Sequence, residues 1–195
     1  SLSNNFTNRL IPTPQTAFER KQILMLGSLK LYKSPLEFIE LAQKLPQFTF
    51  ELVVNDTQEN INGFMKEHKI NICKNLTIYP QQNDVVPFYN QASLVLNLSD
   101  KKQVVETFGL TALEAMSAGL PVIVPTEGGI AEMVVDGENG YKIDVQNLNQ
   151  IAECIKTILS DETLYMKLAQ NALAYSKRFS EAKMVNCIEM ILNRK

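Results

Sequence analysis

The sequence lacks the features that mark several common classes of protein. Its 19 basic and 21 acidic residues leave a net charge of −2, so no basic surface for nucleic acid is implied. Its apolar runs are far shorter than the roughly 20 residues that a membrane-spanning helix needs. We therefore expect neither a nucleic-acid partner nor a transmembrane segment.

Patterns that would bind a metal ion or form disulfides are missing too. The chain has one histidine, His68, and three widely spaced cysteines, Cys73, Cys154 and Cys187. No C-x-x-C pair occurs, which disfavours a zinc site or a redox motif. Free thiols in a reducing cytoplasm are the simpler interpretation. We expect a cytoplasmic protein with no metal site.

Glycine is scarce, with eight residues in 195, which is below the usual ~7%. Six of the eight nevertheless lie between residues 109 and 140. Because glycine permits a positive φ and a close approach of the backbone, unusual backbone geometry is expected in this stretch.

Short apolar runs alternate with amphipathic stretches from residue 21 onward. Runs that are apolar throughout are typical of strands buried on both faces of a parallel sheet. We predict a doubly wound, Rossmann-like α/β fold of about six parallel strands with helices on both faces. Since no Gly-x-Gly-x-x-Gly follows the first run, an NAD-dependent oxidoreductase is disfavoured. Five of the strands are expected at residues 23–26, 50–54, 76–79, 94–98 and 120–124.

The two ends of the chain differ from this central pattern. Residues 1–20 are polar with two prolines and are predicted to form a linker or an arm. The strands are expected to stop after Tyr141. The last expected helix, residues 180–194, has an apolar stripe that requires a surface to cover. The helices expected there span residues 147–159, 161–177 and 180–194, with N-caps at Ser160-Asp161 and Ser180-Glu181.

The turn after the first strand carries a candidate anion site. Ser34-Pro35-Leu36-Glu37 matches a capping box with proline at the first helical position, so a helix should start at Ser34. Lys33 would stand at the positive end of that helix, where a bound anion would relieve the electrostatic conflict. Two solvated surface lysines, Lys30 and Lys33, are the alternative.

A second candidate turn precedes a helix that is rich in alanine. Gly109 should start this helix and Gly119 should end it. The N–H groups of Gly109, Leu110 and Thr111 would then face an anion at the helix start.

Two glutamates bracket this second turn. Glu114 lies one turn into the helix, where its carboxylate can accept two hydrogen bonds from a vicinal diol. Glu106 precedes the turn and should project into the cleft. The same Glu-x7-Glu spacing recurs elsewhere in the chain, so the strand-end context carries the signal.

The stretches from Glu106 to Pro125 and from Gly128 to Tyr141 resemble the donor-binding half of GT-B glycosyltransferases. They are most similar to the retaining group 1, or GT4-like, family, and the resemblance runs from about Gln22 to Asp144. It implies transfer of a sugar from a nucleotide-diphosphate sugar, with UDP or GDP as the expected nucleotide. The acceptor would be a glycan, a lipid or another molecule, as in polysaccharide biosynthesis. The nucleotide-sugar is a substrate, so no cofactor and no metal ion are implied.

The resemblance also implies roles for particular residues. Glu106 would hold hydroxyls of the donor sugar and act in catalysis with Lys33, and Glu114 would hold the ribose hydroxyls. Ser28 stands where the family has arginine, and the loop Ser99–Val105 is longer than the family's common version. Contacts to the sugar and diphosphate would come from Ser28, Lys33, Glu106, Thr107, Phe108, Gly109, Leu110 and Thr111. The base would lie against Tyr79, Pro80 and Gln81, and Gly128 and Gly129 would lie beside the sugar.

GT-B enzymes have two Rossmann-like domains, so the resemblance implies that residues 21–178 are one domain of a longer protein. Residues 1–20 would be the interdomain linker, and residues 179–195 would form a helix that crosses toward an N-terminal domain. That domain would be the partner that binds the acceptor and provides any peripheral membrane association, so this chain alone would be inactive. A nucleotide-sugar epimerase, a phosphorylase and a non-catalytic nucleotide-sugar-binding module stay open as alternatives on the same fold.

Overall fold

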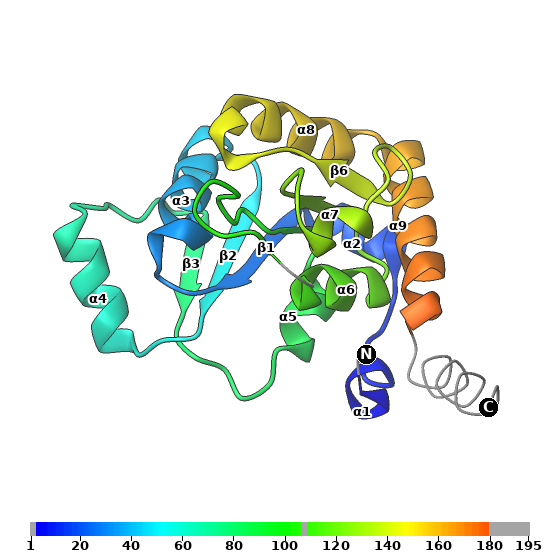
Figure 1. The fold of residues 1–195 in the computed structure, drawn as a ribbon, viewed down its shortest axis with the longest axis horizontal. Helices are drawn as coiled ribbons and strands as arrows, with labels where there is room; N and C mark the ends of the chain where they lie inside the picture. Colours follow the sequence, from blue (N-terminus) through cyan, green and yellow to red (C-terminus); the bar gives the residue numbers. More distant parts are fainter. Residues whose placement is uncertain (1–2, 107–108, 180–195) are drawn as a thin grey trace, which may run out of the picture.

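A computed structural model describes residues 3–106 and 109–179. Its centre is a sheet of six parallel strands in the order β3-β2-β1-β4-β5-β6 (Figure 1). The five predicted strands are confirmed, although β4 and β5 are shorter than the apolar runs that contain them. The strands are β1 (Gln22–Gly27), β2 (Thr49–Val54), β3 (Leu76–Tyr79), β4 (Leu94–Leu96), β5 (Val122–Val124) and β6 (Gly140–Lys142).

Strand β6 is not among the five strands that the apolar runs predicted, and it begins at Gly140. Gly140 pairs with Val122 of β5, and a Cβ on Gly140 would lie 2.4 Å from the carbonyl oxygen of Val122. Glycine therefore allows this last strand to approach its neighbour. Gly137 lies in the preceding turn, with a φ of +72°.

Two groups of helices flank the sheet. In one group, α3 packs on α8 and on strand β2; in the other, α9 packs on α6 and α2, and α5 contacts β1 (Figure 1). The helices predicted over 147–159 and 161–177 are confirmed as α8 and α9. The helices are α1 (Asn4–Thr7), α2 (Pro14–Arg20), α3 (Pro35–Lys44), α4 (Gln58–Glu67), α5 (Val86–Gln91), α6 (Leu110–Ser117), α7 (Gly129–Glu132), α8 (Leu148–Ser160) and α9 (Glu162–Ser176), with 3₁₀ turns η1 (Leu31–Lys33), η2 (Val145–Asn147) and η3 (Lys177–Phe179).

The N-terminal segment is more ordered than the sequence pattern indicated. Its second proline, Pro14, occupies the first turn of α2, where the missing N–H costs no hydrogen bond. Ala17 is buried, and the ring of Phe18 lies 5.3 Å from that of Tyr165 on α9. Tertiary packing thus holds as a helix what the composition alone predicted to be an irregular arm. Its role as an interdomain linker stays a prediction.

The helix predicted over 180–194 lies outside the described residues. No helix within the described ranges is both long and apolar enough to cross a membrane.

The junction between α8 and α9 gives a first testable prediction. Asp161 is the N-cap of α9, and its Oδ1 accepts a hydrogen bond of 2.9 Å from the backbone N–H of Leu164. Asp161→Ala should lower the free energy of unfolding by about 1 kcal/mol, because that N–H loses its acceptor. Urea unfolding measures the loss. Asp161→Asn keeps a side-chain acceptor and is the control: equal losses in the two variants would contradict the capping role.

Candidate functional site

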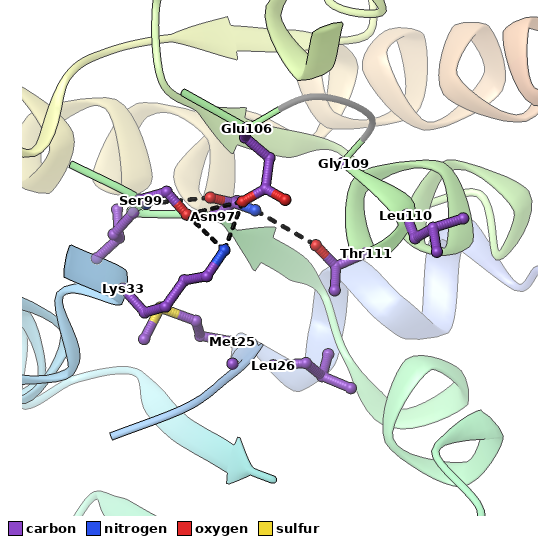
Figure 2. A pocket seen from close by; sticks show the side chains of 11 residues that line it. Met25, Leu26, Lys33, Asn97, Ser99, Glu106, Gly109, Leu110 and Thr111 are labelled. Atoms are coloured by element: carbon purple, nitrogen blue, oxygen red, sulfur yellow. Dashed lines mark hydrogen bonds and ion pairs between the residues drawn. The ribbon is translucent and has the colours of Figure 1, made fainter. Parts of the chain in front are cut away.

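The site lies where the direction of strand addition reverses. The chain adds β2 and β3 on one side of β1 and then returns to add β4, β5 and β6 on the other side. In open parallel sheets, ligands bind outside the carboxyl ends of the strands at this switch point. A pocket of about 460 Å³ opens there (Figure 2). Its lining residues are Met25, Leu26, Gly27, Lys33, Asn97, Leu98, Ser99, Glu106, Gly109, Leu110 and Thr111.

An ion pair between Lys33 and Glu106 spans this pocket. The Nζ of Lys33 lies 2.6 Å from Oε2 of Glu106, and the side chains are 25% and 22% exposed. Lys33 follows β1 and Glu106 follows β4, so the two adjacent strands bring them together (Figure 2). The Ser99 hydroxyl also donates to Glu106 Oε2, at 3.0 Å. Both residues thus line one pocket, and their predicted roles with a donor sugar and in catalysis stay predictions.

The protonation of Glu106 reflects opposing effects. Burial raises the pKa of its carboxyl group, but the hydrogen bond and charge of Lys33 lower it, as do hydrogen bonds from Ser99 and Asn97. The combined effect places the pKa below its ordinary value. Glu106 is therefore an ionised carboxylate at neutral pH, able to accept hydrogen bonds from hydroxyl groups.

The structure corrects the predicted capping box at Ser34. Helix α3 begins at Pro35, as expected, but Ser34 has a φ of +57° and its side chain makes no capping hydrogen bond. A side-chain N-cap normally requires an extended backbone, whereas the left-handed conformation of Ser34 ends η1. Lys33 also differs from the free cation envisaged at the helix start, because Glu106 supplies its counter-charge. Lys30 is exposed, which agrees with the alternative in which it is a solvated surface lysine.

Helix α6 forms one side of the pocket as predicted. Gly109 is its N-cap with a φ of +59°, and a Cβ there would lie 2.4 Å from Cγ1 of Ile130. Gly119 follows the helix end with a φ of +72°. The first N–H groups of a helix have no acceptor within it, and those of Leu110 and Thr111 belong to residues that line the pocket.

Gly128 lies directly against the backbone of Glu106. It is the N-cap of α7 with a φ of +96°, and a Cβ would lie only 2.4 Å from the carbonyl oxygen of Glu106. The predicted Gly128-Gly129 pair is thus close to the site through the backbone of Glu106. Direct contact of these glycines with a sugar stays a prediction.

Glu114 lies outside the residues that line the pocket. It is half-buried one turn after Thr111, and its Oε2 accepts a hydrogen bond of 2.6 Å from the hydroxyl of Tyr89. Burial raises the pKa of Glu114, against the lowering effect of that hydrogen bond. Its predicted role with a ribose stays untested.

The three residues predicted to contact a base, Tyr79, Pro80 and Gln81, do not line one pocket together. Gln81 lines a neighbouring pocket of about 200 Å³, which shares Leu26 and Gly27 with the first pocket. Tyr79 instead donates its hydroxyl to Oε1 of Glu51 at 3.2 Å, and the Pro80 carbonyl accepts from the side chain of Gln82.

Other predicted residues also lie apart from the lining. Ser28 is not among the lining residues, and its hydroxyl accepts a hydrogen bond from the N–H of Lys30. Thr107 and Phe108 lie outside the described residues. Residues 3–106 and 109–179 contain no group of three or more side chains that could hold a metal ion. Metal independence stays a prediction.

Sequence reasoning missed Asn97 and Ser99, which line the pocket, and Tyr89, which donates to Glu114. Asn97 and Ser99 flank the end of the predicted strand 94–98, and polar residues at that point were the available signal. Tyr89 gave no signal, because its partner lies 25 residues away in the sequence.

The long loop between β4 and Glu106 is anchored to neighbouring strand ends. The N–H of Asp100 donates to the carbonyl of Tyr32 in η1 at 2.8 Å. Lys101 lies 2.8 Å from the carboxylates of both Glu127 and Asp144, which follow β5 and β6. These contacts fix the position of the loop that carries Glu106 relative to the loop that carries Lys33.

The fold and site together define a class: a doubly wound parallel α/β domain with a charged pocket at its switch point. Comparison with known sequences identifies the family. The sequence model of the glycosyl transferases group 1 family matches residues 10–175, and the chain belongs to that family.

Two relatives illustrate how far the sequence similarity extends. The chain is 30% identical over 141 residues to N-acetyl-alpha-D-glucosaminyl L-malate synthase of Bacillus anthracis, covering 72% of this chain and 36% of the enzyme. It is 39% identical over 80 residues to the uncharacterized glycosyltransferase MJ1178 of Methanocaldococcus jannaschii, covering 41% of this chain and 23% of that protein. The matched stretches thus cover well under half of the length of each of these relatives.

Solved structures show the same fold. The C-terminal domain of LpcC, a glycosyl transferase group 1 family protein from Francisella tularensis, is similar with a TM-score of 0.71 and 27% identity. The match covers 88% of this chain and 95% of that domain. Anabaena Alr3699/HepE, solved in complex with UDP and glucose, is similar with a TM-score of 0.76 and 24% identity. That match covers all of this chain and 53% of HepE.

Proposed function

We propose that this chain is the donor-binding domain of a retaining, GT4-like glycosyltransferase that uses a nucleotide-diphosphate sugar. The observation that carries the proposal is the Lys33–Glu106 pair in a switch-point pocket whose other side is the start of α6. The complexes of HepE with UDP, with UDP-glucose, and with UDP and glucose support the choice of ligand. The acceptor would bind to parts of the protein outside this chain.

The charges suit the bond that such an enzyme breaks. When the bond between the anomeric carbon and the diphosphate breaks, negative charge grows on the leaving oxygen and positive charge on the sugar ring. Lys33 and the N–H groups of α6 would stabilise the diphosphate. Glu106 would exchange its contact with Lys33 for hydroxyls of the sugar. The oxygen of the acceptor hydroxyl would form the new bond to the anomeric carbon, and its proton would pass to the leaving diphosphate oxygen. In this arrangement Lys33 replaces the charge that a metal ion would otherwise supply.

Binding of nucleoside diphosphates tests the proposal directly. Calorimetric titration of the chain with UDP, GDP and ADP should show weak binding of at least one of them, whereas uridine without phosphate should bind far less. Lys33→Met should weaken diphosphate binding about tenfold, because a charge-assisted hydrogen bond contributes about 1.5 kcal/mol or more. Failure of all three nucleotides to bind at millimolar concentration would overturn the proposal.

A matched variant separates the site from general surface charge. Lys30 lies in the same loop but is exposed, and its Nζ lies 5.7 Å from the centre of the Tyr32 ring. Lys30→Met removes the same net charge and should leave the affinity close to that of the original chain. Equal weakening by the two variants would show that Lys33 acts only through the overall charge.

A further inference from the structure

The buried hydroxyl of Tyr89 makes a short contact with the side chain of Glu114. The two residues lie on different helices, α5 and α6, and the hydroxyl oxygen is 2.6 Å from Oε2 of Glu114. This length is typical of an O–H donor on a carboxylate. The carbonyl oxygen of Thr111 is also near the hydroxyl, but at 3.5 Å. A hydroxyl has one proton to donate, so Glu114 is its principal acceptor.

Tyr89 is held in place and acts as the donor in its contact with Glu114. Its side chain is 1% exposed, and its ring meets that of Phe6 edge-on at 6.0 Å. Burial, followed by the nearby charge of Glu114, raises the pKa of Tyr89 well above its ordinary value. The hydroxyl therefore keeps its proton at neutral pH.

Glu114 is placed within reach of a molecule in the main pocket. Thr111 lines that pocket and precedes Glu114 by three residues on α6, so the two side chains lie on the same face of the helix. Within the described part of the chain, Oε2 has a donor whereas Oε1 has none. One oxygen is thus fixed and the other is available.

We propose that Tyr89 is a positioning residue: its hydroxyl fixes Glu114 so that the free carboxylate oxygen can accept hydrogen bonds from vicinal ribose hydroxyls of a bound nucleotide. This inference rests on the proposed function. Tyr89, a core residue, would then help the site to distinguish a ribonucleotide from a nucleotide that lacks the ribose hydroxyls.

The consequence of removing the hydroxyl follows from burial. In Tyr89→Phe the ring still fills its place in the core, but the half-buried carboxylate of Glu114 loses its donor. Glu114 then has no fixed orientation and accepts less well from a diol. The proposed contact of Lys33 with a diphosphate involves neither Tyr89 nor Glu114 and should be unaffected.

The experiment compares UDP with 2′,3′-dideoxy-UDP by calorimetry. The original chain should bind UDP about tenfold more tightly, and Tyr89→Phe should reduce that preference to about threefold or less with unchanged affinity for the dideoxy compound. If the titrations above select GDP or ADP, the corresponding dideoxy pair is used. Glu114→Gln should reduce the preference similarly, and adding Tyr89→Phe to it should reduce the preference no further.

Tyr165→Phe is the matched control. Tyr165 is also fully buried, and its hydroxyl donates to the carbonyl of Ser93 at 2.7 Å, away from Glu114. This variant should leave the preference unchanged even though it removes a buried hydrogen bond. A preference in Tyr89→Phe equal to that of the original chain would overturn the positioning role and leave the proposed function standing. Absence of any nucleoside diphosphate binding by the original chain would overturn both.

Discussion

Gly128→Ala is expected to lower the free energy of unfolding by about 2–4 kcal/mol, since it combines a strained backbone with overpacking. The φ of Gly128 is +96°, and the new Cβ would lie 2.4 Å from the carbonyl oxygen of Glu106 and 3.1 Å from Cγ1 of Val105. A backbone oxygen cannot move aside as the end of a flexible side chain can. Relief of the clash must therefore shift Glu106 itself.

The same substitution should consequently weaken nucleotide binding. A shift of Glu106 separates its carboxylate from Lys33 and Ser99, which now hold it at 2.6 and 3.0 Å. Urea unfolding measures the loss of stability, and titration with UDP below the unfolding midpoint measures the loss of the site.

Gly63→Ala is the control for this prediction. Gly63 lies within α4, and apart from its chain neighbours and the backbone of its own helix no heavy atom lies within 4 Å of its would-be Cβ. Alanine there should raise stability by about 0.5–1 kcal/mol, because glycine is a poor residue inside a helix. A Gly128→Ala variant as stable as the original chain would contradict the prediction, because it would show that the backbone around Glu106 can move to accept the Cβ without loss of stability.

Lys33→Met should lower the stability of the chain at pH 7 by about 1–3 kcal/mol. Removing one partner of a fully buried ion pair costs about 3–5 kcal/mol, and the 25% and 22% exposure of this pair reduces the cost. The loss arises because the Glu106 carboxylate stays partly buried but loses the cation that offsets the cost of burying its charge. Burial is the largest single influence on the pKa of Glu106.

The pH dependence of that loss has a definite sign. In the original chain the pKa of Glu106 is lowered. Its contribution to stability is therefore present above the unfolded-state pKa and disappears as the pH falls through the folded-state value. In Lys33→Met burial should raise the pKa of Glu106, so acidification relieves the penalty by protonating the carboxylate. The difference in stability between the two proteins should hence shrink from pH 7 toward pH 4.

Urea unfolding at several pH values provides the measurement. Lys44→Met is the control, because Lys44 pairs with Glu40 at 3.4 Å on an exposed helix surface, where an ion pair is worth well under 1 kcal/mol. Adding Glu106→Gln to Lys33→Met should recover part of the lost stability. A pH-independent loss in Lys33→Met would mean that the lysine contributes through packing of its alkyl chain alone.

Several elements were predictable because their signals are local. Strands buried on both faces are apolar along their whole length, and this pattern located five of the six strands. Gly109 and Gly119 bounded α6 correctly, since backbone conformations with positive φ favour glycine. The missed strand, β6, has three residues, of which one is glycine and one is lysine, so neither length nor apolarity distinguished it.

The errors at Ser34 and at residues 14–20 have a different origin. Ser34 matched a local capping pattern, but the 3₁₀ turn that brings Lys33 to Glu106 requires a left-handed residue there. Residues 14–20 gave no helical periodicity, but packing of α2 against α9 stabilises them as a helix. In both cases contacts with distant parts of the chain outweighed local preference.

The sequence by itself determined which residues could carry charge and where backbone freedom was needed: Glu106 and Lys33 at strand ends, and Gly109 and Gly128 beside them. It also carried the alternation of strands and helices, because burial on a fixed period leaves a readable pattern. Only the tertiary structure decided that Lys33 pairs with Glu106 across 73 residues and that Tyr89 holds Glu114. Such pairings depend on strand order and helix packing, which no local pattern in one sequence encodes.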